Sequence, residues 1–371
     1  MCQHKLMLDS GRFCYPTTEF KTMPFTRWTA GIAAMFLIIS VATAKETKSP
    51  DPLFQSTEML DVRIVAPLTT LLYERPLDEE LPATLQYEDS AGQTVEFDIK
   101  IRTRGRFRRQ KDVCAFPPMR LNFKASETKD TLFHKQNKVK LVTHCKSSSR
   151  YEQVILREYT AYRILNVMTD ASFRVRLLRI TYVDSEGENE DSVAHGFIIE
   201  NKERLAKRLD KNHLGISATT VESLEPAYAN MVSLFHYLIG NTDYSPIKGV
   251  ETEACCHNHV LFGNDGEAIW SVPYDFDQAG LVNAPHARPN PRFNLGDVSK
   301  RLYRGRCYHN DQLAGSIAQF NDKREELMAV ISEVDDATSN SNKMMARYVN
   351  KFYDTINSER RVGSKLVKKC I

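Results

Sequence analysis

The sequence predicts an α+β protein of two lobes, with a sheet-rich N-terminal lobe that contains one helix and a mostly helical C-terminal lobe that contains a hairpin. Residues 60–143 have the pattern of short strands, clearest at 95–104, where apolar and charged residues alternate. From residue 202 onward, apolar residues recur at helical spacing instead. The two patterns meet near residues 200–202, where we expect a ligand-binding cleft.

The individual elements follow from the same patterns. Strands are predicted at residues 61–66, 95–104, 119–123, 138–142, 174–183 and 196–199, with an acidic loop at 184–191. Helices are predicted at residues 151–168, 202–210, 226–238, 312–334 and 342–356. Two further strands, 260–262 and 268–272, are joined by Gly-Asn-Asp-Gly and form a hairpin.

Length and composition are those of a globular protein. The chain has 371 residues, of which 42% are apolar and 26% are charged, and these values exclude a mostly disordered or multispan membrane chain. The net charge of +3 gives no reason to expect a nucleic-acid partner.

An export signal is predicted near the N-terminus. Residues 30–41 form an apolar run that is preceded by Arg27 and followed by Ala-Thr-Ala at 42–44. Twelve apolar residues are too few to cross a bilayer, which takes about 20. An uncleaved anchor is the alternative to a cleaved signal peptide. We expect a secreted, periplasmic or cell-envelope protein with no membrane span after cleavage.

The predicted organisation has five parts. Residues 1–22 are interpreted as an extension that results from a wrongly chosen start, and 23–44 as the signal peptide. Residues 45–59 are a polar, proline-bearing linker. The N-terminal lobe then covers 60–200, and the C-terminal lobe covers 201–371.

Six cysteines follow the predicted cleavage site, and an even number in an exported protein predicts disulfides. The sequence leaves all fifteen pairings open among Cys114, Cys145, Cys255, Cys256, Cys307 and Cys370. Adjacent cysteines at 255–256 with histidines at 257 and 259 could also suggest zinc. Ligands so close together close a tetrahedron poorly, so a disulfide is favoured there.

Oxygen-bearing side chains are predicted to converge at one end of the hairpin. Asn258 precedes its first strand, Asp275 and Asp277 follow its second strand, and Asp243 follows the helix at 226–238. A hairpin returns the chain to its start, here with a register mismatch of about three residues, or roughly 10 Å. Asparagine and carboxylate oxygens are the ligands that Mg²⁺ or Mn²⁺ favours, although such residues can also simply stabilise local turns.

A second pair is predicted in the N-terminal lobe. Lys140 lies in a strand, and Glu158 lies in the apolar stripe of the next helix, where an unpaired charge would be costly. Lys138 and Lys146 compete with Lys140 for this role, and a purely structural ion pair is the alternative. A strand lysine, a helix glutamate, a hinge and then Asp, Asn and Asp is the element order of a protein-kinase fold, in which these groups serve phosphoryl transfer.

Five motifs in matching order strengthen this interpretation. They are Arg-Thr-Arg-Gly at 102–105, Gly-Phe-Ile-Ile-Glu at 196–200, Asn-Thr-Asp at 241–243, His-Asn at 257–258 and Pro-Tyr-Asp-Phe-Asp at 273–277. Over residues 95–290 the chain resembles the CotH-type (spore-coat protein H) atypical protein kinase family. The sequence departs from the family pattern at 106–107, in the long gap between residues 243 and 258, and in lacking the glycine of Asp-Phe-Gly.

The resemblance implies a secreted two-lobe kinase that transfers the γ-phosphoryl group of ATP to Ser/Thr hydroxyls of a protein with Mg²⁺ or Mn²⁺. Asp243 would be catalytic, and Asn258, Asp275 and Asp277 would hold the metal. The implied nucleotide-binding residues are Lys140, Glu158, Arg104 and Glu200. Two alternatives stay open: a degenerate module that binds a cell-surface polymer or protein, and a metal-dependent phosphoesterase.

Overall fold

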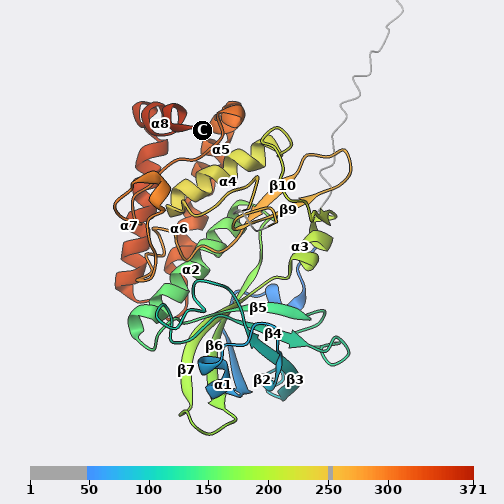
Figure 1. The fold of residues 1–371 in the computed structure, drawn as a ribbon. Coiled ribbons are helices and arrows are strands. Elements are labelled where there is room, and N and C mark those ends of the chain that lie inside the picture. Colours follow the sequence, from blue (N-terminus) through green and yellow to red (C-terminus); the bar gives the residue numbers. More distant parts are fainter. Residues whose placement is uncertain (1–47, 250–253) are drawn as a thin grey trace, which may run out of the picture. The chain divides into compact units, whose positions relative to one another are not determined.

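A computed structural model describes residues 48–249 and 254–371 of the chain. The described residues belong to one compact unit. The predicted extension and signal peptide at residues 1–44 lie outside the described residues. Figure 1 shows the arrangement, with a set of strands at one end and most helices at the other.

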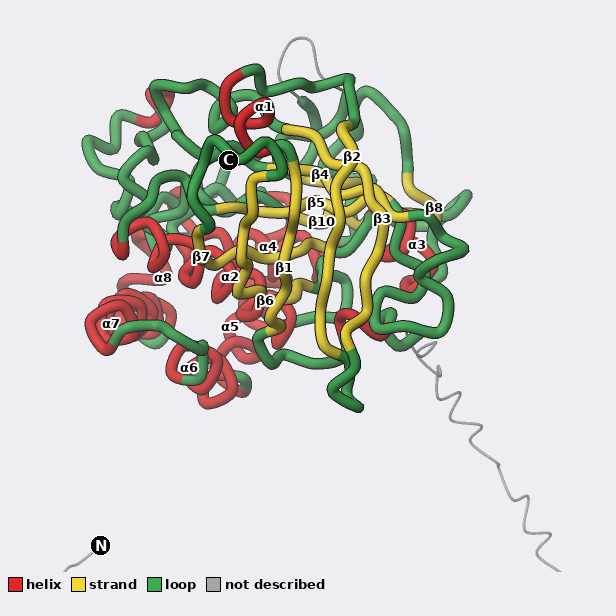
Figure 2. The backbone as a smooth tube through the Cα atoms, turned by 90° about the horizontal axis from the view of Figure 1, so that it is seen from below, coloured by secondary structure: helices red, strands yellow, loops and turns green. Residues whose placement is uncertain are grey.

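Seven strands close into a barrel in the order β1-β2-β3-β4-β5-β7-β6. Figure 2 looks onto these strands from below. Six of the seven strand contacts are antiparallel, and the seventh joins β1 to β6 in parallel, with Leu60 opposite Leu178 and Ala66 opposite Asp184. The strands are β1 (Leu60–Ala66), β2 (Leu81–Glu88), β3 (Thr94–Thr103), β4 (Met119–Phe123), β5 (Lys138–Thr143), β6 (Val175–Asp184) and β7 (Ser192–Ile199).

This closed mixed barrel corrects the predicted fold. The predicted two-lobe protein-kinase-like fold is wrong, because the strands of the N-terminal part close into a barrel through the pairing of β1 with β6. The strand positions themselves were well predicted, apart from β2. Alternation along a strand is the same in an open sheet and in a barrel, so it does not reveal closure between segments about 120 residues apart in sequence.

The barrel has its own apolar core. Phe97, Ile99 and Ile101 of β3 are buried in it, as the alternation predicts. The described part of the predicted linker, residues 48–59, also contributes: it forms a short 3₁₀ helix, η1 (Pro52–Phe54), whose Leu53 and Phe54 are buried in the same core. A short helix, α1 (Leu68–Tyr73), follows β1.

A second core lies among the helices. Helix α2 (Ser149–Met168) packs on β6 and β7 on one side and on α6 and α7 on another. The other helices are α3 (Lys202–Leu209), α4 (Pro226–Ile239), α5 (Leu313–Asp322), α6 (Arg324–Ser332), α7 (Ser339–Ile356) and α8 (Glu359–Lys365). The predicted single helix at 312–334 is thus two helices, which are separated at Lys323. Short 3₁₀ turns are η2 (Pro291–Phe293), η3 (Cys307–Gln312) and η4 (Val367–Lys369).

The predicted hairpin is present and carries a third strand. It consists of β9 (His259–Gly263) and β10 (Trp270–Pro273), and the two-residue strand β8 (Asn212–His213) pairs with the free side of β9. This small sheet lies beside α4 in Figure 1. The hairpin positions Asn258, which precedes β9, and Asp275, which follows β10.

Disulfides join Cys114 to Cys145, Cys255 to Cys256, and Cys307 to Cys370. The first ties the loop after β3 to the segment between β5 and α2, and the third ties η3 to the C-terminal segment. Among the helices that the structure describes, none combines the length and apolarity that a membrane span requires.

Candidate functional site

A cavity of about 560 Å³ brings together seven of the eight site residues that the sequence predicts. These are Arg104, Lys140, Glu158, Asp243, Asn258, Asp275 and Asp277. The loop after β3, strand β5 and helix α2 form one part of its wall, and the ends of the β9–β10 hairpin form another.

The hairpin register places Asn258 beside Asp275. His259 pairs with Pro273, and the N–H of Tyr274 donates to the carbonyl of Asn258 at 3.0 Å. Continuing this register, Asn258 faces Tyr274, which is one residue from Asp275 and three residues from Asp277. The predicted mismatch of about three residues therefore holds for Asp277, whereas Asp275 lies closer. Both residues have left-handed backbones, with φ of 55° for Asn258 and 65° for Asp275. Such conformations are uncommon outside glycine and are most tolerated by Asn and Asp.

Asp243 is held by residues on both sides of it. Helix α4 ends at Gly240, whose left-handed backbone (φ 67°) lets its N–H bond back to the helix. The Asn241 side chain then accepts the N–H of Asp243 at 2.9 Å. The Asp243 carboxylate contacts His257 Nε2 at 2.9 Å through Oδ1, and Asn258 Nδ2 at 3.2 Å through Oδ2. A second bond from Asn258 Nδ2 reaches the carbonyl of Asp243 at 2.7 Å.

Two carboxylates after β10 differ in their surroundings. The backbone N–H of Asp275 donates to the Tyr162 hydroxyl at 2.8 Å, and burial together with the charge of Asp277 raises the pKa of Asp275 to about 6. Asp277 lies 3.2 Å from His286 Nε2. Burial acts to raise the pKa of Asp277, but the His286 hydrogen bond and the charge of Arg108 outweigh it and lower that pKa. Asp277 is therefore the more strongly ionised of the two.

The predicted pairing of Lys140 with Glu158 is not formed. Lys140 Nζ lies over the ring of Tyr274, 4.1 Å from its centre. Glu158 instead has Arg108 as its nearest cation, with Nη1 3.9 Å from Oε2. Burial, with a contribution from Arg104, lowers the pKa of Lys140 to about 7. Burial and Asp277 raise the pKa of Glu158 to about 8, against the effect of Arg108.

Several polar atoms at this site are buried without a hydrogen-bond partner among the described residues. They are Nε of Arg104, Nε of Arg108 and Oε2 of Glu158. Buried polar groups are normally paired, so each of these atoms calls for a partner such as a water, an ion or a ligand. The two guanidinium groups can bind an anion, and the carboxylate can bind a cation.

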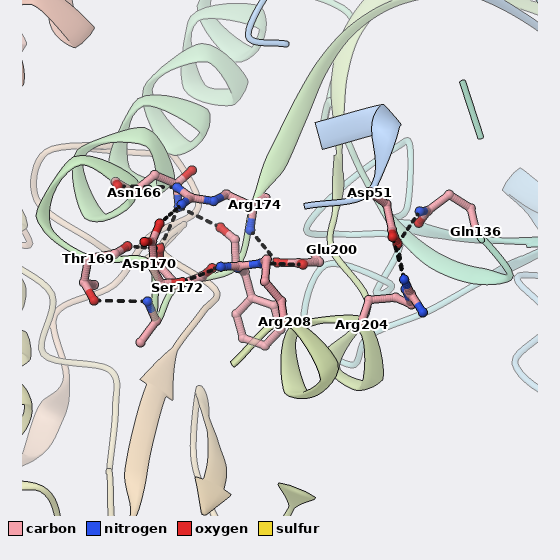
Figure 3. Close-up of polar contacts among 12 residues, drawn as sticks. Asp51, Gln136, Asn166, Thr169, Asp170, Ser172, Arg174, Glu200, Arg204 and Arg208 are labelled. Carbon is pink, nitrogen blue, oxygen red and sulfur yellow. Dashed lines mark hydrogen bonds and ion pairs between the residues drawn. The ribbon is translucent and has the colours of Figure 1, made fainter. Parts of the chain in front are cut away.

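Glu200, the eighth predicted residue, does not line this cavity. Figure 3 shows its carboxylate against Arg208. Arg208 donates to it through Nε at 3.1 Å and Nη2 at 2.9 Å, and the N–H of Arg174 donates at 3.1 Å. The side chains of Glu200 and Arg208 are both almost fully buried. Their ion pair joins the end of β7 to α3, and breaking it would leave an unpaired buried charge.

The donor chemistry of the cavity fits a divalent cation that prefers oxygen. Asp275 and Glu158 both have raised pKa values, partly because Asp277 lies near them, and a bound cation would relieve that repulsion. No three carboxylates of the described cavity lie within 4.8 Å of one another. An ion here would thus have few direct protein ligands and several waters, as Mg²⁺ commonly does.

Another group of potential ligands, in the part of the chain that the structure describes, is Cys114, Cys145 and His286, whose ligand atoms lie within 4.8 Å of one another. Its two sulfur atoms are bonded to each other. A metal is held by thiolates, so the oxidised protein has no metal centre at this group.

The sequence drew attention to Arg108 and His257 without indicating the contacts that they make, and it gave no sign of His286. The arginine-rich run at 104–109 signals Arg108 only as a member of a basic segment. His257 was noted as a possible zinc ligand and as part of the His-Asn motif at 257–258. His286 reaches Asp277 through a loop contact that no sequence pattern indicates.

No protein-family model and no curated protein matches this chain. The function must therefore be argued from the cavity itself.

Proposed function

We propose that this protein is an exported phosphotransferase that binds ATP with Mg²⁺ or Mn²⁺ and transfers the γ-phosphoryl group to a Ser/Thr-type hydroxyl of a protein. One observation carries the proposal: a single cavity combines buried guanidinium groups and a lysine with a cluster of carboxylates and an asparagine. Phosphoryl transfer needs both, because cations must offset the phosphate charge while oxygens hold the metal and the acceptor. The resemblance to the CotH-type kinases supports the same reaction.

Each residue has a role that its surroundings support. Arg104, Arg108 and Lys140 offset the negative charge of a phosphate chain. Asp275 and Asp277 would hold the divalent ion, which when bound neutralises phosphate oxygens. Asp243 orients the acceptor hydroxyl and takes its proton.

Export is part of the proposal. Three cysteine pairs at disulfide distance suit an oxidising compartment, in keeping with the predicted signal peptide. We therefore place the reaction outside the cytoplasm, in a secreted or cell-envelope protein.

The test is transfer of ³²P from labelled ATP to a Ser/Thr peptide library with Mg²⁺ or Mn²⁺. We expect Asp243→Asn and Asp275→Asn each to lower transfer at least a hundredfold. Asp265→Asn is the matched control, because Asp265 is exposed in the turn at the opposite end of the same hairpin. Equal activity in all three variants would refute the assignment. Release of phosphate from simple esters without nucleotide would indicate a phosphoesterase instead.

The contacts of the Asp243 carboxylate favour a second candidate, a module that binds without catalysis. Both carboxylate oxygens of Asp243 are already engaged, by His257 and by Asn258. A carboxylate held in this way has less capacity to accept a proton from a hydroxyl. Metal-dependent ATP binding with no label transfer to any acceptor would support this candidate, and the absence of any ATP-induced thermal shift would exclude the kinase.

A further inference from the structure

A second cavity of about 590 Å³ adjoins the first. Four residues line both cavities: Arg106, Lys140, Cys256 and Tyr274. The metal-binding carboxylates and Asp243 line only the first cavity. A phosphoryl donor whose terminal group lies near Asp243 can therefore extend past Lys140 into the second cavity.

Cationic side chains dominate the second cavity. Its described wall contains Arg106, Arg120, Lys140 and Lys202 and no carboxylate. His213 also lines it, but burial lowers the pKa of that imidazole, so it adds no charge at neutral pH. The cations come from four segments: the loop after β3, strands β4 and β5, and the α3–β8 region. Lys202 Nζ lies 3.3 Å from His213 Nε2.

Three of the nearby cations are aligned across adjacent strands. Arg102 of β3 is opposite Arg120 of β4, and Arg120 is opposite Lys140 of β5. Like charges directly opposite each other destabilise a sheet. Arg102 is offset in part by Glu80 at 3.8 Å. The Nζ of Lys140 lies over the Tyr274 ring, and Asp275 is the carboxylate whose charge acts on it. Burial and then the charges of Arg104, Arg120 and Lys202 lower the pKa of Lys140 against the opposing charge of Asp275, so more cations than carboxylates act on its ammonium group.

The second cavity lacks the features that recognise a nucleobase. Base recognition in proteins commonly uses stacking on aromatic rings. Tyr274 has the only aromatic ring, apart from histidines, among the described lining residues, and the ammonium group of Lys140 occupies one of its faces. Val260 is the one large aliphatic side chain in the described wall.

We propose that the second cavity binds a linear phosphate chain, so that the donor is recognised by its phosphates and not by its base. Inorganic polyphosphate and nucleoside triphosphates share this chemistry. In the reaction, the bond between the terminal phosphorus and its bridging oxygen breaks, and a bond from that phosphorus to the acceptor oxygen forms. The acceptor proton passes to Asp243, and the shortened phosphate chain leaves. The group-transfer step rests on the proposed function, whereas binding of the linear phosphate chain does not.

The test is isothermal titration of the full chain with inorganic tripolyphosphate, ATP, GTP and adenosine. We expect tripolyphosphate, ATP and GTP to bind with dissociation constants within about fivefold of one another, and adenosine not to bind. Arg120→Ala and Lys202→Ala should each weaken tripolyphosphate binding about five- to tenfold. Lys124→Ala is the matched control, because Lys124 is exposed at the end of β4 and outside both cavities.

The outcomes separate this inference from the proposed function. Binding of ATP without binding of tripolyphosphate overturns the inference and leaves the kinase intact. An equal loss in Lys124→Ala, or no loss in Arg120→Ala and Lys202→Ala, shows that the second cavity is not the site. Tripolyphosphate binding without transfer from any donor supports the inference and overturns the phosphotransferase.

Discussion

Arg108 Nη1 lies 3.9 Å from Oε2 of Glu158, and less than a tenth of each side chain is exposed. Arg108 also donates through Nη2 to the carbonyl of Thr143. Burial raises the pKa of Glu158 to about 8, with Asp277 adding to the effect. The Glu158 carboxyl is therefore mostly protonated at neutral pH, and a bound cation would have to displace that proton.

Glu158→Gln should consequently change the stability of the free protein little. Glutamine resembles the neutral carboxyl, so we expect a loss of less than about 1 kcal/mol at pH 7 by urea denaturation, against about 3–5 kcal/mol for breaking a fully charged buried pair. Metal-dependent nucleotide binding should weaken about tenfold or more in the same variant. A loss of several kcal/mol would show that Glu158 is ionised.

The raised pKa of Glu158 also predicts that the stability of the folded protein depends on pH. The unfolded chain releases the Glu158 proton near its ordinary pKa of 4.5, whereas the folded chain keeps it until about 8. The folded state thus binds more protons between these values, and stability falls as pH rises through that window. Subtracting the Glu158→Gln profile from the wild-type profile should isolate this fall.

His195 links the barrel to the helices, and its raised pKa favours the charged form, whereas the raised pKa of Glu158 favours the neutral form. His195 of β7 contacts Glu152 of α2 at 2.5 Å through Nδ1, and Asp336, between α6 and α7, at 3.0 Å through Nε2. Arg179 of β6 also faces Asp336, at 3.8 Å. The Glu152 hydrogen bond raises the pKa of His195 above 6.5, against burial.

The stabilising contribution of His195 should be fully present below pH 6.5 and should disappear as pH rises through its raised pKa. His195→Gln should therefore cost about 1 kcal/mol or more at pH 5.5 and much less at pH 9, measured by urea denaturation. His213→Gln is the control, because burial lowers the pKa of His213. Equal costs of His195→Gln at both pH values would contradict the prediction.

Local patterns predicted most strands, the main helices and the meeting of Asp243, Asn258, Asp275 and Asp277 at one cavity. Asp275 and Asn258 could be placed together because a hairpin determines which residues meet at its ends. Closure of the barrel could not be predicted, since it depends on β1 meeting β6 across a long stretch of sequence. The partner of Glu158 was missed for a similar reason, because Arg108 reaches it from an irregular loop.

Glu200 shows a different error, in which a binding role was predicted for a residue whose contacts are structural. It stands in a motif position that implies nucleotide binding, yet its carboxylate is used by Arg208 within the fold. A motif records residue types and not their partners. A buried acid that follows a strand therefore needs a structure to separate a binding role from an ion pair.

Replacing either of two glycines with alanine should change the unfolding free energy, but in opposite directions. Gly280 follows the Asp275–Asp277 segment, and its N–H bonds to the carbonyl of Gly240 at 3.2 Å. A Cβ at Gly280 would collide with the Tyr348 hydroxyl and lie 2.8 Å from the carbonyl of Val298. We expect Gly280→Ala to cost about 1–3 kcal/mol of unfolding free energy.

Gly315 is the matched control for this change. It lies inside helix α5, and nothing stands within 4 Å of an added Cβ. Alanine there should stabilise by about 0.5–1 kcal/mol, because it lowers the backbone entropy of the unfolded chain. Chemical denaturation of both variants checks the pair, and a stabilised Gly280→Ala protein would contradict the packing around Tyr348.

Lys140 should react as an unusually nucleophilic amine. Its pKa is lowered to about 7, so most of it is neutral at pH 7.5, whereas an ordinary lysine is neutral in only about one molecule per thousand. Cyanate is small enough to enter the open cavity and reacts with neutral amines. We expect Lys140 to be carbamylated at least tenfold faster than Lys124, whose pKa the neighbouring Glu127 raises.

Peptide mass spectrometry after brief exposure to cyanate measures both rates in one sample. Tripolyphosphate should protect Lys140 and leave Lys124 unchanged, because a bound anion both covers the amine and favours its charged form. Equal rates at the two lysines would show that Lys140 is fully charged at neutral pH. Such a result would mean that burial and the neighbouring cations do not disfavour the charged form of Lys140.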